Sequence, residues 1–392
     1  MPEYAVGRYE YQAQFPGLDR ELVPKIRQVL LRGGYVLGPE VRLFEQSFAQ
    51  YLGVREAVGV NSGTDALILA LDALGIGPGD EVITVANTFH ATVMAIIRVG
   101  ATPVIVDCRP DTYLLDLEQA QAAISERTKA IIPVHLFGQA MDMRSVMALA
   151  DKYELMVVED CAQAIGARSD STLVGTQGHV ACWSFAPAKN LACAGDGGMV
   201  STNDEGLADR LRSLRNFGQS KNYEHQLIGY NSRLDGLQAL VLTHKLPFIN
   251  IWNAQRAVIA RRYKDQLGHL PVRFQEGAAE GEHVYHLFQL ETVKRDHLLA
   301  FLRRQSIDVV IRYPSPIHLQ PAFAHLRHRF GEFPVAERLA KHTLCLPLFP
   351  SMREEQIDLV CKAVADFFHG GLNRSHEIQV AQPERRSPFP SS

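Results

Sequence analysis

The chain has 392 residues, of which 46% are hydrophobic and 21% charged, and its formal net charge is −3. This composition is typical of a globular protein with room for two domains at ~100–200 residues each. It lacks the strong basic charge of nucleic-acid binders, and no segment reaches the ~20 apolar residues of a membrane span. We therefore expect no nucleic-acid partner and no membrane partner.

The N-terminus and the cysteines indicate a cytoplasmic protein. The first residues lack the basic start and apolar stretch of a secretory signal. The six cysteines are scattered and form no C-x-x-C pair, so we interpret them as reduced thiols and expect no disulfide framework, zinc site or other metal site. They are Cys108, Cys161, Cys182, Cys193, Cys345 and Cys361.

Helical and strand patterns alternate from about residue 38 to residue 209. An amphipathic helix comes first, followed by apolar strands separated by helical segments, the first of these at 64–75. Strands buried on both faces with crossover helices between them predict a mainly parallel α/β sheet with helices on both faces. The helix face comprises Val41, Phe44, Phe48, Tyr51 and Leu52, and the strands are expected at 57–60, 81–85, 102–107, 130–135, 155–160, 182–186 and 197–202.

The second half of the chain has a mixed pattern. A long helical stretch covers 236–267 and is interrupted at Pro247. A strand, a helix and another strand are then expected at 285–292, 295–305 and 307–313. We therefore predict a large domain at 1–250, a smaller C-terminal α+β domain at 251–370, and a disordered polar, proline-rich tail at 371–392.

Lys189 is the first candidate catalytic residue. It lies in SFAPAKNLACAGDGG, between an apolar strand and a glycine-rich turn. A lysine nucleophile must be partly stripped of water so that its pKa falls, and a loop leaving a buried strand provides such a place. An ordinary surface lysine is the alternative, because most lysines are exposed.

Asp160 ends the predicted strand LMVVED, at the edge where a doubly wound sheet opens its ligand crevice. A carboxylate there can hold the protonated pyridine nitrogen of pyridoxal phosphate. Glu159 precedes it, and strand alternation points the two side chains to opposite faces. Asp160 is preferred because it lies nearest the strand end, and a helix N-cap is its alternative role.

The segment NSGTDA at 61–66 follows a strand and opens a helix. Free backbone N–H groups at a helix start bind phosphate, and Ser62 and Thr64 add hydroxyl donors beside Gly63. Simple N-capping is the alternative. The glycine cluster at 75–80 follows a helix and precedes a strand, the wrong order for a dinucleotide fingerprint.

A phosphate cradle, a carboxylate at a strand end and a later lysine are the contacts that a pyridoxal phosphate site needs. In the order of these three elements along the chain, and in further motifs, the sequence resembles the DegT/DnrJ/EryC/StrS sugar aminotransferases, which are fold-type I pyridoxal phosphate enzymes. The resemblance covers roughly residues 38–360. It is carried by GPEVRLFEQSFAQYLGV, VNSGTDALILAL, GIGPGDEVITVANTF, GATPVIVD, AIIPVHLFGQ, VVEDCAQAIGA, SFAPAKNL, GDGGMV, LRNFGQ, GYNSRLDGLQA, RYPSPIHLQPAF and FPVAERLAKHTLCLPLFP.

The resemblance implies a role for each matching residue. Lys189 would be the Schiff-base lysine and proton shuttle, and Asp160 the partner of the pyridine nitrogen. Asn231 would reach the phosphate of a neighbouring subunit, which implies a homodimer with shared active sites. The other implied cofactor contacts are Gln163 near the ring oxygen, Phe89 on the ring face, and Ser62, Gly63, Thr64 and Ser184 at the phosphate. Phe89 as a core aromatic and Asn231 as a turn residue are the alternatives.

The resemblance also implies the reaction, which is transfer of an amino group from L-glutamate to a nucleotide-linked keto sugar. DCAQA and YNSRLD are similar to the branch that aminates 3-keto sugars, so a dTDP-3-keto-6-deoxyhexose is expected. The alternatives are a 4-keto sugar or a cyclitol and, more remotely, a non-enzymatic regulator. Tyr35, Tyr313 and His318 would line the sugar pocket, although a surface or capping role also suits His318.

The chain departs from the family pattern at four positions. Ala186 and Ala188 replace a Tyr and a Thr or Gly, Ile165 replaces a His, and Gly236 replaces a Glu. None of these is an implied cofactor contact, so they bear on the identity of the sugar and not on the cofactor. Members with histidine in place of the lysine are dehydratases, and the intact Lys189 favours transamination.

Overall fold

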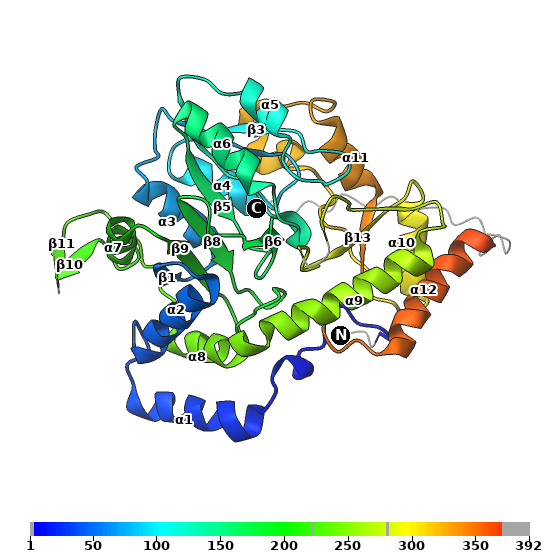
Figure 1. Ribbon diagram of the computed structural model, residues 1–392, viewed down its shortest axis with the longest axis horizontal. Helices are drawn as coiled ribbons and strands as arrows, with labels where there is room; N and C mark the ends of the chain where they lie inside the picture. Colours follow the sequence, from blue (N-terminus) through cyan, green and yellow to red (C-terminus); the bar gives the residue numbers. More distant parts are fainter. Residues whose placement is uncertain (1–3, 222, 280–281, 371–392) are drawn as a thin grey trace, which may run out of the picture.

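The computed structural model describes residues 4–221, 223–279 and 282–370. Its central sheet has the strand order β1-β9-β8-β5-β4-β2-β3 (Figure 1). Each neighbouring pair is parallel except the two that involve β9. The strands are β1 (Glu56–Val60), β2 (Glu81–Val85), β3 (Thr102–Val106), β4 (Thr128–Ile131), β5 (Met156–Asp160), β8 (Val180–Ser184) and β9 (Gly198–Thr202).

Helices cover both faces of this sheet, as predicted. On one face, α3 and α7 pack with Val58, Val158 and Val200. On the other face, α2 and α8 pack with Ala57 and Ala181, while α6 covers the β4–β2 side. The helices of this part are α1 (Val23–Arg32), α2 (Pro39–Leu52), α3 (Gly63–Ala73), α4 (His90–Arg98), α5 (Leu117–Ala122), α6 (Met143–Tyr153), α7 (Glu205–Leu214) and α8 (Gly236–Lys245).

A second core forms around the antiparallel sheet β12-β13-β14, at the right of Figure 1. Its strands are β12 (Arg273–Phe274), β13 (Phe288–Glu291) and β14 (Thr343–Leu346), and the helices here are α9 (Ile249–Leu267), α10 (Arg295–Arg304), α11 (Pro334–His342) and α12 (Glu354–His369). A short 3-10 turn at Leu246–Phe248 separates α8 from α9, which places the break at Pro247 as expected. Two small hairpins complete the described strands: β6 (Arg168–Ser169) with β7 (Thr172–Leu173), and β10 (Gln219–Lys221) with β11 (Glu224–His225).

Two chain segments pack across the predicted 250/251 boundary. Val6 belongs to the core of the small sheet. Ile317, Phe323 and Leu339 belong to the core beside β2 and β4. Each segment therefore ties one body to the other. The boundary itself stays a prediction, and the expected disordered tail at 371–392 lies outside the described residues.

The expected strand at 307–313 is wrong. Ile307 forms a parallel bridge with Val6, and Val310 forms an antiparallel bridge with Cys345. Because these two residues, three positions apart, pair with different partners in opposite directions, no continuous ladder develops. The expected strand at 130–135 is also shortened to Ile131, since Pro133 has no N–H to donate. No helix among the described residues is long and apolar enough to cross a bilayer.

Candidate active site

A cavity of about 370 Å³ opens at the carboxyl ends of β5 and β8. The large sheet and its helices supply most of its wall, and the segments at 286–287 and 312–313 close it from the side of the small body. The polar residues in its lining are Tyr9, Ser62, Thr64, Thr88, Asp160, Gln163, Ser184, Lys189, Asp196, His286, Arg312 and Tyr313. The topology therefore brings the predicted lysine, carboxylate and helix start into one space.

Lys189 lies on the turn that follows β8. Its backbone N–H donates to the Ala186 carbonyl at 2.9 Å. The next residue, Asn190, is buried and donates to Asn253 Oδ1 at 2.9 Å and to the Val284 carbonyl at 3.0 Å, which fixes the turn. Burial lowers the pKa of Lys189 to about 8, although the negative charge of Asp160 opposes this shift. Lys189 is thus neutral far more often near physiological pH than an exposed lysine with its ordinary pKa.

Asp160 faces the cavity from the end of β5. Its Oδ2 accepts from the Thr92 hydroxyl at 2.9 Å, and its Oδ1 accepts from the Ala162 N–H at 3.2 Å. Burial raises its pKa, while these hydrogen bonds and Lys189 act in the opposite direction. The carboxylate is thus held in a fixed orientation and still has acceptor capacity toward the cavity.

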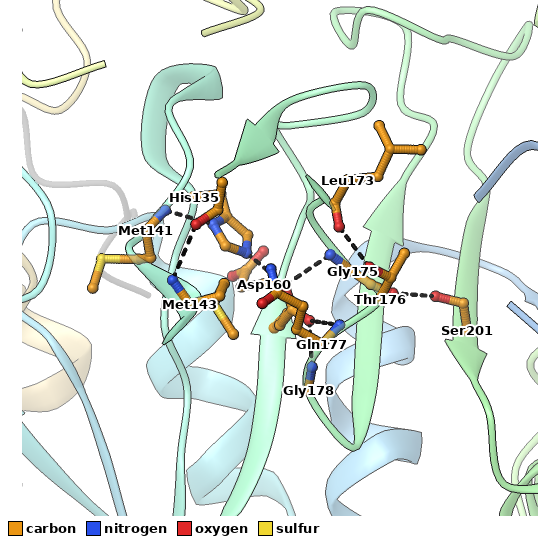
Figure 2. A network of polar contacts seen from close by, with 12 residues as sticks. His135, Met141, Met143, Asp160, Leu173, Gly175, Thr176, Gln177, Gly178 and Ser201 are labelled. Carbon is orange, nitrogen blue, oxygen red and sulfur yellow. Dashed lines mark hydrogen bonds and ion pairs between the residues drawn. The ribbon is translucent and has the colours of Figure 1, made fainter. Parts of the chain in front are cut away.

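Glu159 points to the other face of β5, as strand alternation predicts. Its carboxylate accepts from the N–H groups of Gly175, Gln177 and Gly178 at 2.7, 3.1 and 2.6 Å. His135 Nε2 lies 3.0 Å from the same carboxylate. Figure 2 shows this network beside Asp160 at the strand end. Four donors saturate the carboxylate, so it is a structural anion and not the cofactor ligand.

The same network engages two of the three residues of a possible metal cluster. His135, Glu159 and Cys161 place their ligand atoms within 4.8 Å of one another. His135 Nδ1, however, accepts from the Met141 N–H at 3.0 Å, which leaves Nε2 as the ring donor to Glu159. Both ring nitrogens and the four carboxylate positions are therefore engaged in hydrogen bonds.

The helix start at 62–64 forms a tight cradle. Ser62 caps α3 by accepting from the Asp65 N–H at 3.1 Å. A Cβ at Gly63 would lie 2.6 Å from the Cβ of Ser184, so only glycine lets the helix start approach β8 this closely. Thr64 and Ser184 also line the cavity. Free N–H groups and three hydroxyls thus surround a space that suits a phosphate.

Phe89 and Gln163 also line the cavity, and their expected contacts with the cofactor stay predictions. Phe89 lines the cavity beside Tyr313, with their ring centroids 5.6 Å apart. Gln163 accepts from the Phe137 N–H at 2.8 Å and donates to the Tyr313 hydroxyl at 3.0 Å. These two bonds fix the orientation of the amide, so one of its N–H groups supports the tyrosine that was expected at the sugar pocket.

Three predicted residues do not line the cavity of this single chain. Asn231 is exposed and bridges to Asn216. Tyr35 is exposed, and its hydroxyl donates to the Leu30 carbonyl. His318 is buried and lies 3.0 Å from Glu337 Oε1. Their roles stay predictions, and a role for Asn231 in the cavity requires a second subunit.

Sequence reasoning missed Thr92, His286 and Arg312. Thr92 can be recognised as a site residue only once the start of α4 is known to lie beside β5. Burial, followed by the positive charges of Lys189, Arg256 and Arg312, lowers the pKa of His286 well below its usual value. Its neutral ring donates from Nδ1 to Asn190 Oδ1 at 3.2 Å. Arg312 comes from the segment that was wrongly expected to be a strand.

The site fits pyridoxal phosphate. The glycine-made cradle suits the phosphate, Asp160 is a buried carboxylate that would suit a protonated pyridine nitrogen, and Lys189 is a buried amine with a lowered pKa. A mainly parallel sheet that carries these groups at its carboxyl edge defines the class of fold-type I pyridoxal-phosphate-dependent transferases.

The model of the DegT/DnrJ/EryC1/StrS aminotransferase family matches residues 16–365, and the chain belongs to this family. It is therefore a pyridoxal-phosphate-dependent sugar aminotransferase, which confirms the expected family, fold class, cofactor and enzyme class.

Three curated relatives are each 44% identical to the chain. The dTDP-3-amino-3,4,6-trideoxy-alpha-D-glucose transaminase of Streptomyces venezuelae covers 91% of this chain and 95% of its own length. The UDP-N-acetyl-3-dehydro-alpha-D-glucosamine 3-aminotransferase of Acidithiobacillus ferrooxidans covers 93% and 99%. The third, from Geobacillus stearothermophilus, is called a pleiotropic regulatory protein and covers 91% and 96%.

Solved structures share the fold. The crystal structure of DesV from S. venezuelae has a TM-score of 0.91 and 43% identity, and covers 94% of this chain and 99% of that one. The structure of NtdA from Bacillus subtilis with bound cofactor PMP has a TM-score of 0.87 and 29% identity, with coverages of 94% and 86%.

Proposed function

We propose that the enzyme moves an amino group from L-glutamate to the C3 ketone of a dTDP-linked 3-keto-6-deoxyhexose. The observation that carries the proposal is the joint placement of Lys189 and Asp160 in one cavity beside a phosphate cradle. Lys189 is both the attachment point and the only lysine lining this cavity in the described chain, so it also serves as the base and acid that moves the proton.

Different residues of the chain have different roles in the proposed reaction. When bound, pyridoxal phosphate supplies an electron sink for charge that develops at the reacting carbon. Asp160 holds its ring nitrogen, with Thr92 and Ala162 orienting the carboxylate. Phe89 and Tyr313, which line the cavity, would restrict the access of solvent to the bound cofactor. Lys189, whose pKa is about 8, can accept and return a proton near neutral pH.

Amination at C3 is supported by relatives and by Gln163. The names of four relatives between 38% and 44% identity place the amine or the ketone at C3 of the sugar. Gln163 cannot titrate and offers only fixed amide hydrogen bonds, whereas the 4-keto branch more often has histidine at this place. A site built around particular hydroxyl contacts can discriminate between sugars by ~10⁴–10⁵.

A shared dimeric site forms the second part of the proposal. Asn231 is exposed, while its neighbour Ser232 donates to Asp65 Oδ2 at 2.6 Å and accepts from the Asn61 N–H at 3.2 Å. The loop that carries Asn231 is therefore hydrogen-bonded to the cradle segment, and the Asn231 side chain, which has no hydrogen bond within the described residues, is available to a second subunit. Hybrid dimers of Lys189→Ala and Asn231→Ala chains should regain activity that neither parent has. A monomer by sedimentation, or no complementation, argues against the shared site.

Single-turnover kinetics test the substrate. The enzyme is first converted to its amine-loaded form with L-glutamate and then mixed with 3-keto or 4-keto dTDP-6-deoxyglucose, and the visible absorption is followed. We expect faster recovery of the original spectrum with the 3-keto sugar. Faster recovery with the 4-keto sugar would overturn the C3 assignment and leave the aminotransferase class untouched. UDP-linked 3-keto sugars tested in parallel distinguish the nucleotide.

A further inference from the structure

Arg312 is a cation in the cavity without a protein partner. It is half-buried and lines the same space as Lys189 and Asp160. Across the described ranges 4–221, 223–279 and 282–370, no hydrogen bond or ion pair engages its guanidinium. Other sheltered arginines of the chain are bound: Arg215 pairs with Glu45, and Arg256 donates to two backbone carbonyls. Arg312 therefore has free donors aimed at a ligand space.

The backbone holds Arg312 in place. Val310 bridges to Cys345 on β14, and Gln289 Nε2 on β13 donates to the Arg312 carbonyl at 3.1 Å. The following residue, Tyr313, is held by Gln163. Arg312 thus reaches the cavity from a segment that is anchored to the small sheet.

The charges around the cavity favour an anion. The positive charge of Arg312 acts on both Lys189 and His286, so the three groups lie close together. His286 stays neutral there. Of the two acidic residues in the lining, Asp160 serves the ring nitrogen, and Asp196 forms no ion pair with Arg312 within the described residues. An incoming carboxylate would therefore meet an unpaired cation.

Resting on the proposed function, we propose that Arg312 binds the α-carboxylate of the amino-acid donor. This carboxylate is attached to the same carbon as the amine that must reach the cofactor beside Lys189, so it must enter this cavity. The guanidinium fork matches a carboxylate with two parallel hydrogen bonds. A 6-deoxyhexose brings no charge near its ketone, and its diphosphate is separated from the ketone by the sugar ring. The anion closest to the chemistry is thus the donor carboxylate.

Measuring the half-reaction with L-glutamate and the half-reaction with the keto sugar separately distinguishes binding of the donor carboxylate from other roles of Arg312. Arg312→Gln should lower the efficiency of the L-glutamate half-reaction by about 100-fold, because the carboxylate loses its charged partner. The half-reaction of the amine-loaded enzyme with the keto sugar should stay within about threefold, since no charged contact changes there. Arg312→Lys should fall between wild type and Arg312→Gln, because lysine keeps the charge and loses the fork.

A binding measurement supplements the kinetics. Glutarate is an unreactive dicarboxylate, and calorimetry should show its affinity for the holoenzyme reduced in Arg312→Gln. Arg8→Gln is the matched control: it removes a nearby positive charge that pairs with Asp308 and does not line this cavity. We expect the control to match wild type.

Three outcomes would overturn the inference. The glutamate half-reaction of Arg312→Gln could stay within threefold of wild type, the sugar half-reaction could fall instead, which would assign Arg312 to the diphosphate, or both could fall together with cofactor affinity. A failed proposed function looks different, because wild type itself would then show no spectral change with glutamate or no turnover of any 3-keto sugar.

Discussion

The two sides of the β5 end carry adjacent buried carboxylates with opposite properties. Glu159 accepts hydrogen bonds from three backbone N–H groups and His135, and although burial acts against it, these donors lower its pKa. Asp160 has two hydrogen-bond donors and faces the cavity, and burial raises its pKa. The number of donors supplied by the fold thus decides which anion is structural and which keeps capacity for a ligand.

Loss of the amine on the cavity side should have the largest effect. Lys189→Ala removes both the attachment point and the proton carrier, so activity should fall by at least about 10³-fold. Borohydride reduction followed by peptide mapping should label Lys189 in wild type and leave the variant unlabelled. Exposed Lys362, which pairs with Asp366, provides the control substitution Lys362→Ala. A label on another lysine would refute the assignment.

The substitution Asp160→Ala should cause the next largest loss of activity. The fold and bound cofactor should remain, while turnover falls by about 100-fold or more, because the ring nitrogen loses its charged partner. Steady-state turnover together with the cofactor absorption separates this effect from loss of binding. Near-normal turnover with cofactor bound would contradict the role given to Asp160.

Periodicity and motif order were enough to predict the large sheet and to select Lys189, Asp160 and the helix start at 62–64, which line one cavity. The alternating apolar runs gave β1, β2, β3, β5, β8 and β9, and strand alternation separated Asp160 from Glu159. The small body was harder to predict because its pairing is long-range: Ile307 and Val310 have apolar neighbours but bond to different partners. Thr92 and Arg312 have no sequence signal, since only tertiary packing brings Thr92 to Asp160 and Arg312 to the cavity.

The free energy of unfolding provides a further test, because the ionised forms of the two carboxylates should change it in opposite directions. Glu159, with its lowered pKa, contributes stability that is present above its unfolded value of 4.5 and is lost as the pH falls through the folded pKa. Asp160, with its raised pKa, costs stability above its unfolded value of 3.8. Glu159→Gln should therefore destabilise the apoprotein at pH 7 by about 3 kcal/mol, since it also leaves buried donors unpaired.

Asp160→Asn should instead stabilise the apoprotein at pH 7 by about 1 kcal/mol, because the amide replaces a buried charge. Urea unfolding of both variants and wild type at pH 7 and pH 4 measures the difference, which should narrow at the lower pH. Equal shifts of the same sign would show that the two carboxylates are not distinguished by their donors.

The smallest expected effect concerns the pH dependence of cofactor loading. Only the neutral amine of Lys189 attacks a carbonyl, and its pKa is about 8. The rate at which apoprotein takes up pyridoxal phosphate, followed by absorption, should therefore rise about tenfold between pH 7 and pH 9. The midpoint of this pH dependence tests the two carboxylates separately. Asp160 raises the pKa of Lys189, so Asp160→Asn should move the midpoint to lower pH. Glu159 is not among the groups that act on Lys189, and Glu159→Gln should leave the midpoint in place. A shift in Glu159→Gln, or none in Asp160→Asn, would contradict the division of roles between the two faces of β5.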